Sequence, residues 1–291
     1  MLKFGKLKRL TAGDYIIPII LILFAVIIII PIWYVVTISL TPQHVFFQTR
    51  LLLYPAELTF EHYYRILNLQ MMRTGFRNTL FVTIVGTAYV MFLNVTFAYA
   101  MLKPIPGRKF VWIFLMTTMF VSGGMVPWFM LIVNLGLPNN LLVMILPHGL
   151  AIITVVLMQS YMRTLSPEFE ESAKLDGAGD IRLLWSIVLP LCKPMLATLS
   201  LFAAVGGWNR WFESMMFMQR SDGWSMPHVL RNLLANANLA MEGLPIEARL
   251  GTFGIGLQSA AVVITMIPIV CVYPFLQKYF VKGITLGGVK G

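Results

Sequence analysis

The sequence predicts an all-α membrane protein with six transmembrane helices. Of its 291 residues, 58% are hydrophobic and only 12% are charged, and the mean hydropathy is +0.79. Apolar runs of about 20 residues, the length that crosses the hydrocarbon core as a helix, occur six times. Lysine occurs only in the two termini, in alternate connections between these runs, and at the span ends next to them. The bilayer is therefore the expected solvent for this chain.

The six spans are predicted at residues 15–39, 76–101, 108–133, 139–161, 190–212 and 257–278, all within a single transmembrane domain of residues 1–291. Basic residues precede the first run, as they do in a secretory signal peptide. The run from Tyr15 to Ser39 is too long for a signal peptide and lacks a small-residue cleavage site. We therefore interpret it as an uncleaved first span.

Basic residues predict the orientation, because lysine and arginine are retained on the cytoplasmic side of a membrane. With six spans, the N-terminus, the second and fourth connections and the C-terminus share one side. These segments and the span ends next to them hold all the lysines, whereas the other side has eight arginines and no lysine. A multi-pass protein of the cell membrane with both termini in the cytoplasm is therefore expected. The net charge of +10 fits contact with anionic lipid better than contact with nucleic acid.

The connections between the spans differ in character. Residues 40–75 include an amphipathic run, FEHYYRILNL, which we expect to lie along the membrane surface. The run KPIPGRK, from Lys103 to Lys109, predicts a tight turn because its prolines and glycine cannot continue a helix. The last external connection, about residues 213–256, predicts a small lobe that contacts a soluble partner.

Two of the spans contain residues that interrupt helices. The run SGGMVPW, from Ser122 to Trp128, places two glycines and a proline within the third span. Neighbouring helices or a water-lined cavity must satisfy the backbone groups that such a break frees. This break could serve close packing between helices or line a translocation path, and the sequence leaves both alternatives open. Pro147 and His148 pose the same choice in the fourth span, and no carboxylate lies beside His148 in sequence to suggest a proton relay.

Enzymatic chemistry is not indicated by the sequence. No Walker A pattern occurs, and the run GTFGIG from Gly251 to Gly256 follows no strand. Cys192 and Cys271 lie far apart and form no CxxC pair, so no metal site is predicted. An intramembrane enzyme or an ion-coupled carrier would need a nucleophile with a base, or buried carboxylates. Apart from His148, the ionisable residues lie mainly at span ends or in connections.

The polar connection between the fourth and fifth spans, about residues 166–190, begins with a predicted short helix. Ser166 suits the N-cap and Pro167 the first helical position. The acidic residues that follow favour the positive end of the helix dipole. Gly177 and Gly179 are expected to end this helix.

A second short helix is predicted after the glycines. Asp180 is expected to cap it, and Pro190 to kink the chain into the next span. Its apolar stripe consists of Ile181, Leu184, Trp185 and Val188.

The first of these helices carries small residues beside acidic ones. Ser172 and Ala173 would let another protein approach the backbone closely, while acids such as Glu171 and Asp176 stay solvated or pair with arginines of the partner. This combination favours a docking surface over an active site. The alternative, an ordinary amphipathic loop, would require neither the small residues nor the paired glycines.

The spacing of this connection closely resembles the EAA loop of inner-membrane permease subunits of binding-protein-dependent ABC importers. The matching positions are Glu171, Ser172, Ala173, Gly177, Ile187, Leu189 and Pro190, with Ser172 where alanine is commonest. The likeness extends along the whole chain, including SGGMVPW, LGLPNNLLVMILP, GGWNRWF and the closing QKYFVKGITLGGVKG. It is nearest to the carbohydrate branch, to permeases of maltose type and for complex oligosaccharides.

This resemblance implies a type I importer permease fold and a non-enzymatic permease. The helix from Glu171 to Gly177, with Ser172, Ala173 and Asp176, would be the coupling helix that docks into a cleft of a separate ATPase. ATP and Mg²⁺ would be used by the ATPase dimer, and this chain would bind no cofactor. A second permease subunit would complete the pathway, and an extracellular sugar-binding protein would deliver the substrate.

The resemblance also implies two further contacts, by position alone. The external segment from Asn232 to Gly251 would reach the binding protein, and the tail from Gly287 to Gly291 would approach the ATPase.

Substrate contact is the remaining question. Sugars are held by aromatic faces and by amides, and Trp208, Asn209 and Trp211 offer that mixture at the end of the fifth span. An interfacial belt or simple packing would use the same residue types. The cargo also stays open between a sugar, expected to be an oligosaccharide derived from a polysaccharide, and another polar solute such as a peptide.

Overall fold

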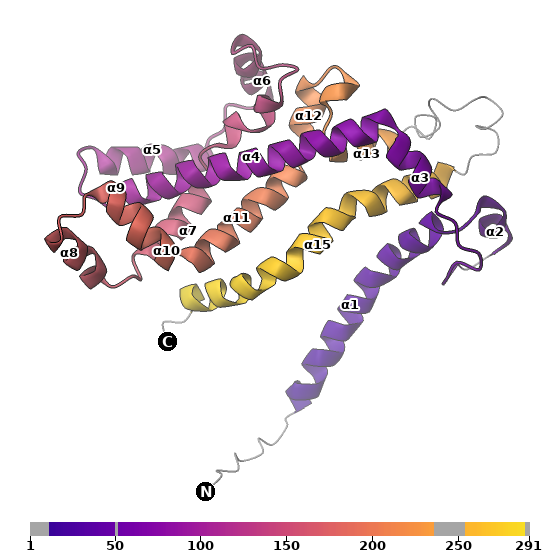
Figure 1. The fold of residues 1–291 in the computed structure, drawn as a ribbon, viewed down its shortest axis with the longest axis horizontal. Coiled ribbons are helices and arrows are strands. Elements are labelled where there is room, and N and C mark those ends of the chain that lie inside the picture. Colours follow the sequence, from indigo (N-terminus) through magenta and orange to yellow (C-terminus); the bar gives the residue numbers. More distant parts are fainter. Residues whose placement is uncertain (1–11, 50–51, 236–253, 289–291) are drawn as a thin grey trace, which may run out of the picture. The chain divides into compact units, whose positions relative to one another are not determined.

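The computed structural model describes residues 12–49, 52–235 and 254–288. Within these ranges every regular element is a helix (Figure 1). The contacts within the chain divide it into two compact units, Met1–Ile66 with Asn236–Ile264 and Leu67–Ala235 with Thr265–Gly291. The expectation of a single domain over residues 1–291 stays a prediction.

The first unit is dominated by α1, Ala12–Ser39. Tyr15–Ser39 is the apolar part of this helix. In its most hydrophobic stretch of 18 residues, 0% of the residues are buried by the rest of the chain. That part of the helix requires lipid or another protein around it, whereas its C-terminal end is packed, with Ile38 buried against Leu52.

The segment after α1 folds back on the end of that helix. It includes α2, Gln43–Gln48, and α3, Glu61–Asn68. The Ser39 and Tyr63 hydroxyls lie 2.6 Å apart, and His62 Nε2 lies 3.2 Å from the carbonyl oxygen of Thr41. His62 and Ile66 are buried, whereas Tyr64 is 73% exposed. The expected position of this segment along the membrane surface stays a prediction.

The second unit is built around α4, Gln70–Ala100. The other elements that lie in it are α5 (Arg108–Phe120), α6 (Met125–Asn134), η1 (Leu141–Met144), η2 (Leu146–His148), α7 (Ile152–Met162), α8 (Pro167–Leu175), α9 (Asp180–Leu183), the π-helix η3 (Leu184–Val188), α10 (Leu189–Leu191), α11 (Lys193–Trp208), α12 (Phe212–Phe217), η4 (Ser221–Gly223), α13 (Met226–Ala235) and α15 (Gly254–Gly288) from residue 265 onward.

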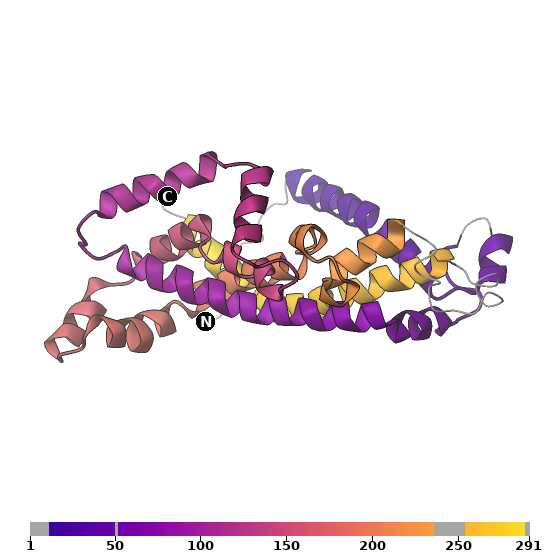
Figure 2. The ribbon, with the colours of Figure 1, turned by 90° about the horizontal axis from the view of Figure 1, so that it is seen from above.

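Three described helices are long and apolar enough to cross a membrane, and the number rises to six if each bent pair of helices is one span. The bent pairs are Arg108–Phe120 with Met125–Asn134 at 116°, Leu141–His148 with Ile152–Met162 at 48°, and Asp180–Leu191 with Lys193–Phe217 at 85°. Figure 2 shows the sharp bend between α5 and α6. The third, fourth and fifth apolar runs of the sequence are thus broken helices.

Two of these breaks coincide with residues that interrupt helical hydrogen bonding. Gly124, with φ of 85°, separates α5 from α6, and Pro147 and Gly149 lie at the break before α7. A buried amide satisfies part of the backbone at that second break. Asn94 Nδ2 donates to the Gly149 carbonyl at 2.7 Å, and Asn94 Oδ1 accepts from the Ala151 amide at 2.8 Å. This amide performs the compensation that a break inside a membrane requires.

Helix α4 packs against α7, α11 and α13. Small residues allow close approach at two of these contacts. A Cβ on Gly207 of α11 would lie 3.3 Å from Thr83 Cα, and one on Gly75 would lie 3.0 Å from a methyl carbon of Val229 in α13. The turn after α4 lies beside α8 and α9 at one end of this bundle (Figure 1).

Candidate functional site

Helix α8 begins as the sequence predicts. Pro167 is at the first helical position and Ser166 is the N-cap residue, with extended backbone. The Ser166 side chain makes no capping hydrogen bond, but its carbonyl oxygen accepts from the Phe169 amide at 3.3 Å. The acidic residues of the first turn face the positive end of the helix dipole.

Gly177 ends α8 in a Schellman motif. Its φ is 77°, in the left-handed region that glycine adopts without strain. The Ala178 amide donates to the Ala173 carbonyl at 2.9 Å, and the Gly177 amide donates to the Lys174 carbonyl at 3.0 Å. These two hydrogen bonds satisfy the last carbonyls of α8 and reverse the chain within three residues.

The second helix differs from the prediction in two details. Asp180 is its first residue, and the N-cap position is occupied by Gly179, which has no side chain to form a cap. Pro190 lies inside a helical stretch, and the 85° bend falls after it, at Cys192. The π-helix η3 just before Pro190 supplies a wider turn, which accommodates a residue without an N–H group.

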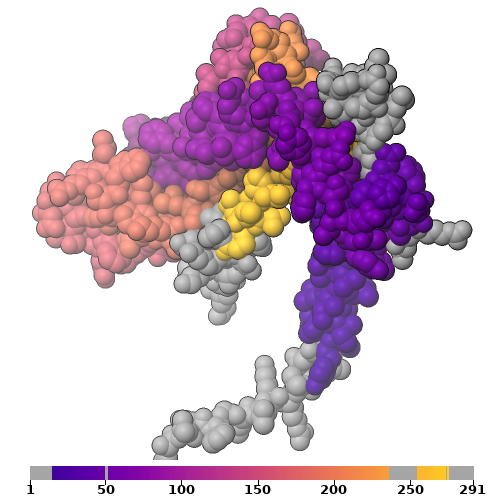
Figure 3. Space-filling view, turned by 45° about the vertical axis from the view of Figure 1, so that its right-hand side comes forward, coloured from indigo at the N-terminus to yellow at the C-terminus, as the bar shows by residue number. Residues whose placement is uncertain are grey.

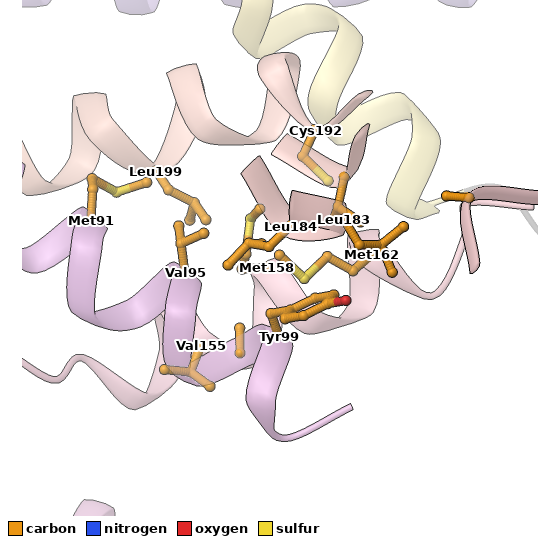
Figure 4. Close-up of a cluster of buried hydrophobic side chains, with 13 residues drawn as sticks. Met91, Val95, Tyr99, Val155, Met158, Met162, Leu183, Leu184, Cys192 and Leu199 are labelled. Atoms are coloured by element: carbon orange, nitrogen blue, oxygen red, sulfur yellow. The ribbon is translucent and has the colours of Figure 1, made fainter. Parts of the chain in front are cut away.

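The α8–α10 hairpin, residues 167–191, is docked on the helix bundle by a buried hydrophobic cluster. The cluster joins the hairpin to α4, α7 and α11, as Figure 4 shows for its labelled side chains. Its buried members are Met91, Val95, Ala98, Tyr99, Val155, Met158, Met162, Ala173, Leu183, Leu184, Val188, Cys192 and Leu199. A displacement of the hairpin would therefore displace the helices that share this cluster.

Ala173 is placed differently from the sequence-based interpretation. Its residue exposure is 6%, and it belongs to the cluster beneath the hairpin. Its small size permits α8 to pack on its own bundle, so it offers no surface to another protein in this structure. Ile181 and Trp185, which were expected in the apolar stripe, are instead 78% and 52% exposed, while Leu184 and Val188 are buried.

The exposed end of the hairpin, here called the hairpin tip, combines polar and apolar groups. Leu175 is 89% exposed and stands directly before the Schellman turn. Sequence reasoning missed Leu175, although its position two residues from the inward-facing Ala173 places it on the opposite side of α8. The tip consists of Glu171, Ser172, Leu175, Asp176, Gly177 and Ile181, all exposed. Figure 3 shows the segment around α8 and α9 projecting at one end of its unit.

The three predicted substrate residues do not share one environment. Trp208 is 5% exposed, its ring meets Phe76 edge-on with centroids 5.9 Å apart, and its indole N–H has no acceptor among the described residues. Asn209 is exposed, and its amide donates to the Val205 carbonyl at 3.0 Å. The Arg231 guanidinium lies 4.2 Å from the centre of the half-buried Trp211 ring. Trp208 is thus a packing residue, whereas Asn209 and Trp211 remain accessible.

The fold brings His148 to a carboxylate that is distant in sequence. His148 Nε2 lies 2.9 Å from Glu213 Oε1, and the Glu213 side chain is 13% exposed. The Arg210 guanidinium donates to the Met144 carbonyl. These contacts tie the broken fourth span to α12, and no local sequence signal links residues 65 positions apart.

Two expected contacts fall largely outside the described residues. In the external segment from Asn232 to Gly251, residues 236–251 are not described, and in the tail from Gly287 to Gly291, residues 289–291 are not described.

The described residues thus form a helical bundle with broken spans and a Schellman-capped hairpin docked on it. Residues 107–286 match the family model described as the binding-protein-dependent transport system inner membrane component. The chain belongs to this family. It is therefore a membrane-embedded permease of an ABC importer and not an enzyme, because a separate ATPase subunit hydrolyses ATP.

Characterised relatives cover nearly the whole chain. Protein LplC of Bacillus subtilis (strain 168) is 32% identical over 271 residues, with 90% of each chain covered. The polygalacturonan/rhamnogalacturonan transport system permease protein YtcP of the same organism is 32% identical over 274 residues, covering 93% of this chain and 96% of YtcP.

A solved structure shows the same fold. It is the crystal structure of a bacterial ABC transporter involved in the import of the acidic polysaccharide alginate. One of its chains is 29% identical, with a TM-score of 0.85, and the match covers 94% of this chain and 100% of that chain. The predicted all-α fold of a type I importer permease is thereby confirmed.

Proposed function

We propose that this chain forms half of the translocation pathway for an oligosaccharide derived from a polysaccharide. The names of its relatives support this cargo, since YtcP is named for polygalacturonan and rhamnogalacturonan and the solved relative for alginate. Accessible Asn209 and Trp211 supply an amide and an aromatic ring, the groups that bind sugar hydroxyls and ring faces. They are the residues of this chain that we expect nearest the substrate.

The hairpin tip is the proposed contact with the ATPase. The observation that carries this proposal is a tip of exposed side chains on a hairpin whose base is buried in the helix bundle. Glu171, Ser172 and Asp176 offer polar contacts, and Leu175 adds an apolar one. Gly177 sets the direction of the tip, while Ala173 holds α8 against the bundle.

The coupling follows from rigid-body mechanics. ATP-driven closure of an ATPase dimer would draw two such hairpins together. Because this hairpin shares a buried cluster with α4, α7 and α11, its displacement would rotate those helices and alternate the access of the pathway. ATP and Mg²⁺ belong to the ATPase dimer in this proposal, and this chain binds no cofactor.

The proposed assembly contains a second permease subunit, an ATPase dimer and an extracellular sugar-binding protein. The hairpin would lie in the cytoplasm together with both termini, in agreement with the distribution of lysine. The described part of α1 that is exposed along its length would contact lipid or the second permease.

Purification and transport assays test this function. A tagged chain, purified in mild detergent, is expected to retain a second permease and an ATPase, and the complex in liposomes is expected to import oligosaccharides when the binding protein is added. Glu171→Ala is expected to lower uptake while membrane insertion is unchanged. Import of peptides in place of sugars would overturn the cargo, and normal uptake by both Glu171→Ala and Gly177→Ala would overturn the coupling role of the tip.

A further inference from the structure

Lys103, in the turn after α4, contacts both helices of the hairpin. Its ammonium forms ion pairs with Glu170 of α8 and with Asp180 of α9, the second at 3.2 Å. It also lies 4.7 Å from the centre of the Tyr99 ring, and the Tyr99 hydroxyl donates to Asp180 Oδ1 at 3.4 Å. One cation therefore joins the end of α4 to the hairpin on each side of its glycine turn. We call Lys103, Glu170, Asp180 and Tyr99 the Lys103 clamp.

The clamp is partly shielded from water. The Lys103 side chain is 21% exposed and that of Glu170 is 38%, whereas that of Asp180 is 64% exposed. Shielded ion pairs are screened less than exposed ones, so the contact with Glu170 is the stronger of the two. Lys174, one turn along α8, also lies 3.0 Å from Glu170 but is 55% exposed.

Both main partners of the clamp are charged at neutral pH. Burial acts to lower the pKa of Lys103, but hydrogen bonds with Glu170, Tyr99 and Asp180 outweigh burial and raise that pKa above its usual range. The hydrogen bond from Lys103 lowers the pKa of Glu170 against the opposing effect of burial. The ion pair is therefore intact at the pH at which transport proceeds.

Helix α8 has little else to hold it in place. Among its residues, all of which the structure describes, only Ala173 is buried. A cavity of about 210 Å³ lies between α8 and the bundle, lined by residues that include Phe169, Met162 and Leu183. A helix beside unfilled space can swing about its glycine turn unless a second contact restrains it.

We propose that Lys103 is a positioning residue that fixes the hairpin to the end of α4, so that a displacement of α8 moves the spans. This inference rests on the proposed coupling function of the hairpin tip. Without the clamp, the same displacement would be absorbed at the Gly177 turn and in the cavity. Lys103 would act through the hairpin and would contact neither the substrate nor ATP.

The test measures coupling in the complete importer, reconstituted in liposomes with its ATPase, partner permease and binding protein. The readout is the number of ATP molecules hydrolysed per sugar imported. Lys103→Gln is expected to raise this ratio about tenfold with normal assembly, and Lys103→Arg to stay within about twofold of the unmodified chain. Exposed Lys109, at the start of α5, provides the matched control Lys109→Gln, which is expected to leave the ratio unchanged.

A charge exchange separates a specific ion pair from a general structural effect. Lys103→Glu is expected to uncouple the importer, and adding Glu170→Lys to it is expected to recover at least half of the lost coupling. Spin labels on Ser172 and Arg108 would report a broader distance distribution in Lys103→Gln. A normal ATP-to-sugar ratio in Lys103→Gln, or no recovery in the exchanged pair, would overturn the inference.

The control outcomes also distinguish this inference from the function on which it rests. If Gly177→Ala and Glu171→Ala uncouple the importer but Lys103→Gln does not, the hairpin tip retains its role and only the clamp is wrong. If none of the three variants changes the ratio, the coupling function of the hairpin itself is wrong.

Discussion

Replacement of Gly177 by alanine should loosen the hairpin without creating a steric clash. An L-residue pays about 1–2 kcal/mol in the left-handed region, and Gly177 has φ of 77°. A Cβ at this position meets nothing within 4 Å, so the backbone conformation supplies the whole cost. The lower conformational entropy of an unfolded chain with alanine offsets part of it, which leaves a net cost of about 1 kcal/mol.

That cost translates into a measurable opening of the turn. About 1 kcal/mol corresponds to roughly a fivefold change in an equilibrium constant. The Ala178 amide, which donates to the Ala173 carbonyl at 2.9 Å, reports the turn directly. Its hydrogen exchange is expected to accelerate about fivefold in Gly177→Ala, and the ATP-to-sugar ratio of the reconstituted importer is expected to rise with it.

Two variants control this prediction. Gly177→Asn should remain close to the unmodified chain, because asparagine tolerates the left-handed region. Gly179→Ala should also be neutral, since Gly179 has φ of −74° and ψ of 163°, and its Cβ would meet nothing within 4 Å. Equal exchange and coupling in Gly177→Ala and Gly179→Ala would refute the reasoning.

Three further predictions concern stability in detergent. Ala173→Leu should destabilise the fold by about 1–3 kcal/mol through overpacking of a residue that is 6% exposed, whereas Ser172→Leu on the exposed side should leave the melting temperature unchanged. Asn94→Leu should cost about 2–3 kcal/mol, because its amide satisfies backbone groups at the break before α7, and Thr96→Ala serves as its control in thermal melts. Burial lowers the pKa of His228 from 6.5 to about 4, which means that the folded chain favours the neutral imidazole. The contribution of His228 to the free energy of unfolding is therefore complete above pH 6.5 and is lost as pH falls toward 4. The free energy of unfolding should fall by about 3 kcal/mol over this range. His228→Gln should abolish this part of the pH dependence, and an unchanged pH profile in that variant would contradict the prediction.

The sequence predicted those features that depend on neighbouring residues. The apolar run from Tyr15 to Ser39 has to be a helix in lipid, since only internal hydrogen bonds can satisfy its backbone. Pro167 and Gly177 likewise predicted where α8 begins and ends, because fixed φ and left-handed φ are local properties of the chain.

Features that depend on which side a residue faces were harder to predict. The helical period placed Ala173 and Leu175 on opposite sides of α8, but it did not say which side the bundle covers. The structure buries Ala173 and exposes Leu175. Trp208, likewise, suits a sugar contact or a packed core by residue type, and its contact with Phe76 shows that it is packed.

The sequence by itself determined the class of this protein: an all-helical membrane permease with a polar hairpin between its fourth and fifth apolar runs. Only the tertiary structure paired Lys103 with Glu170 and Asp180, and His148 with Glu213. In the sequence Lys103 indicates only orientation, and Asp180 suits only a helix cap. Pairing between distant charges depends on how helices cross, and that geometry results from packing over the whole bundle and not from any local run of residues.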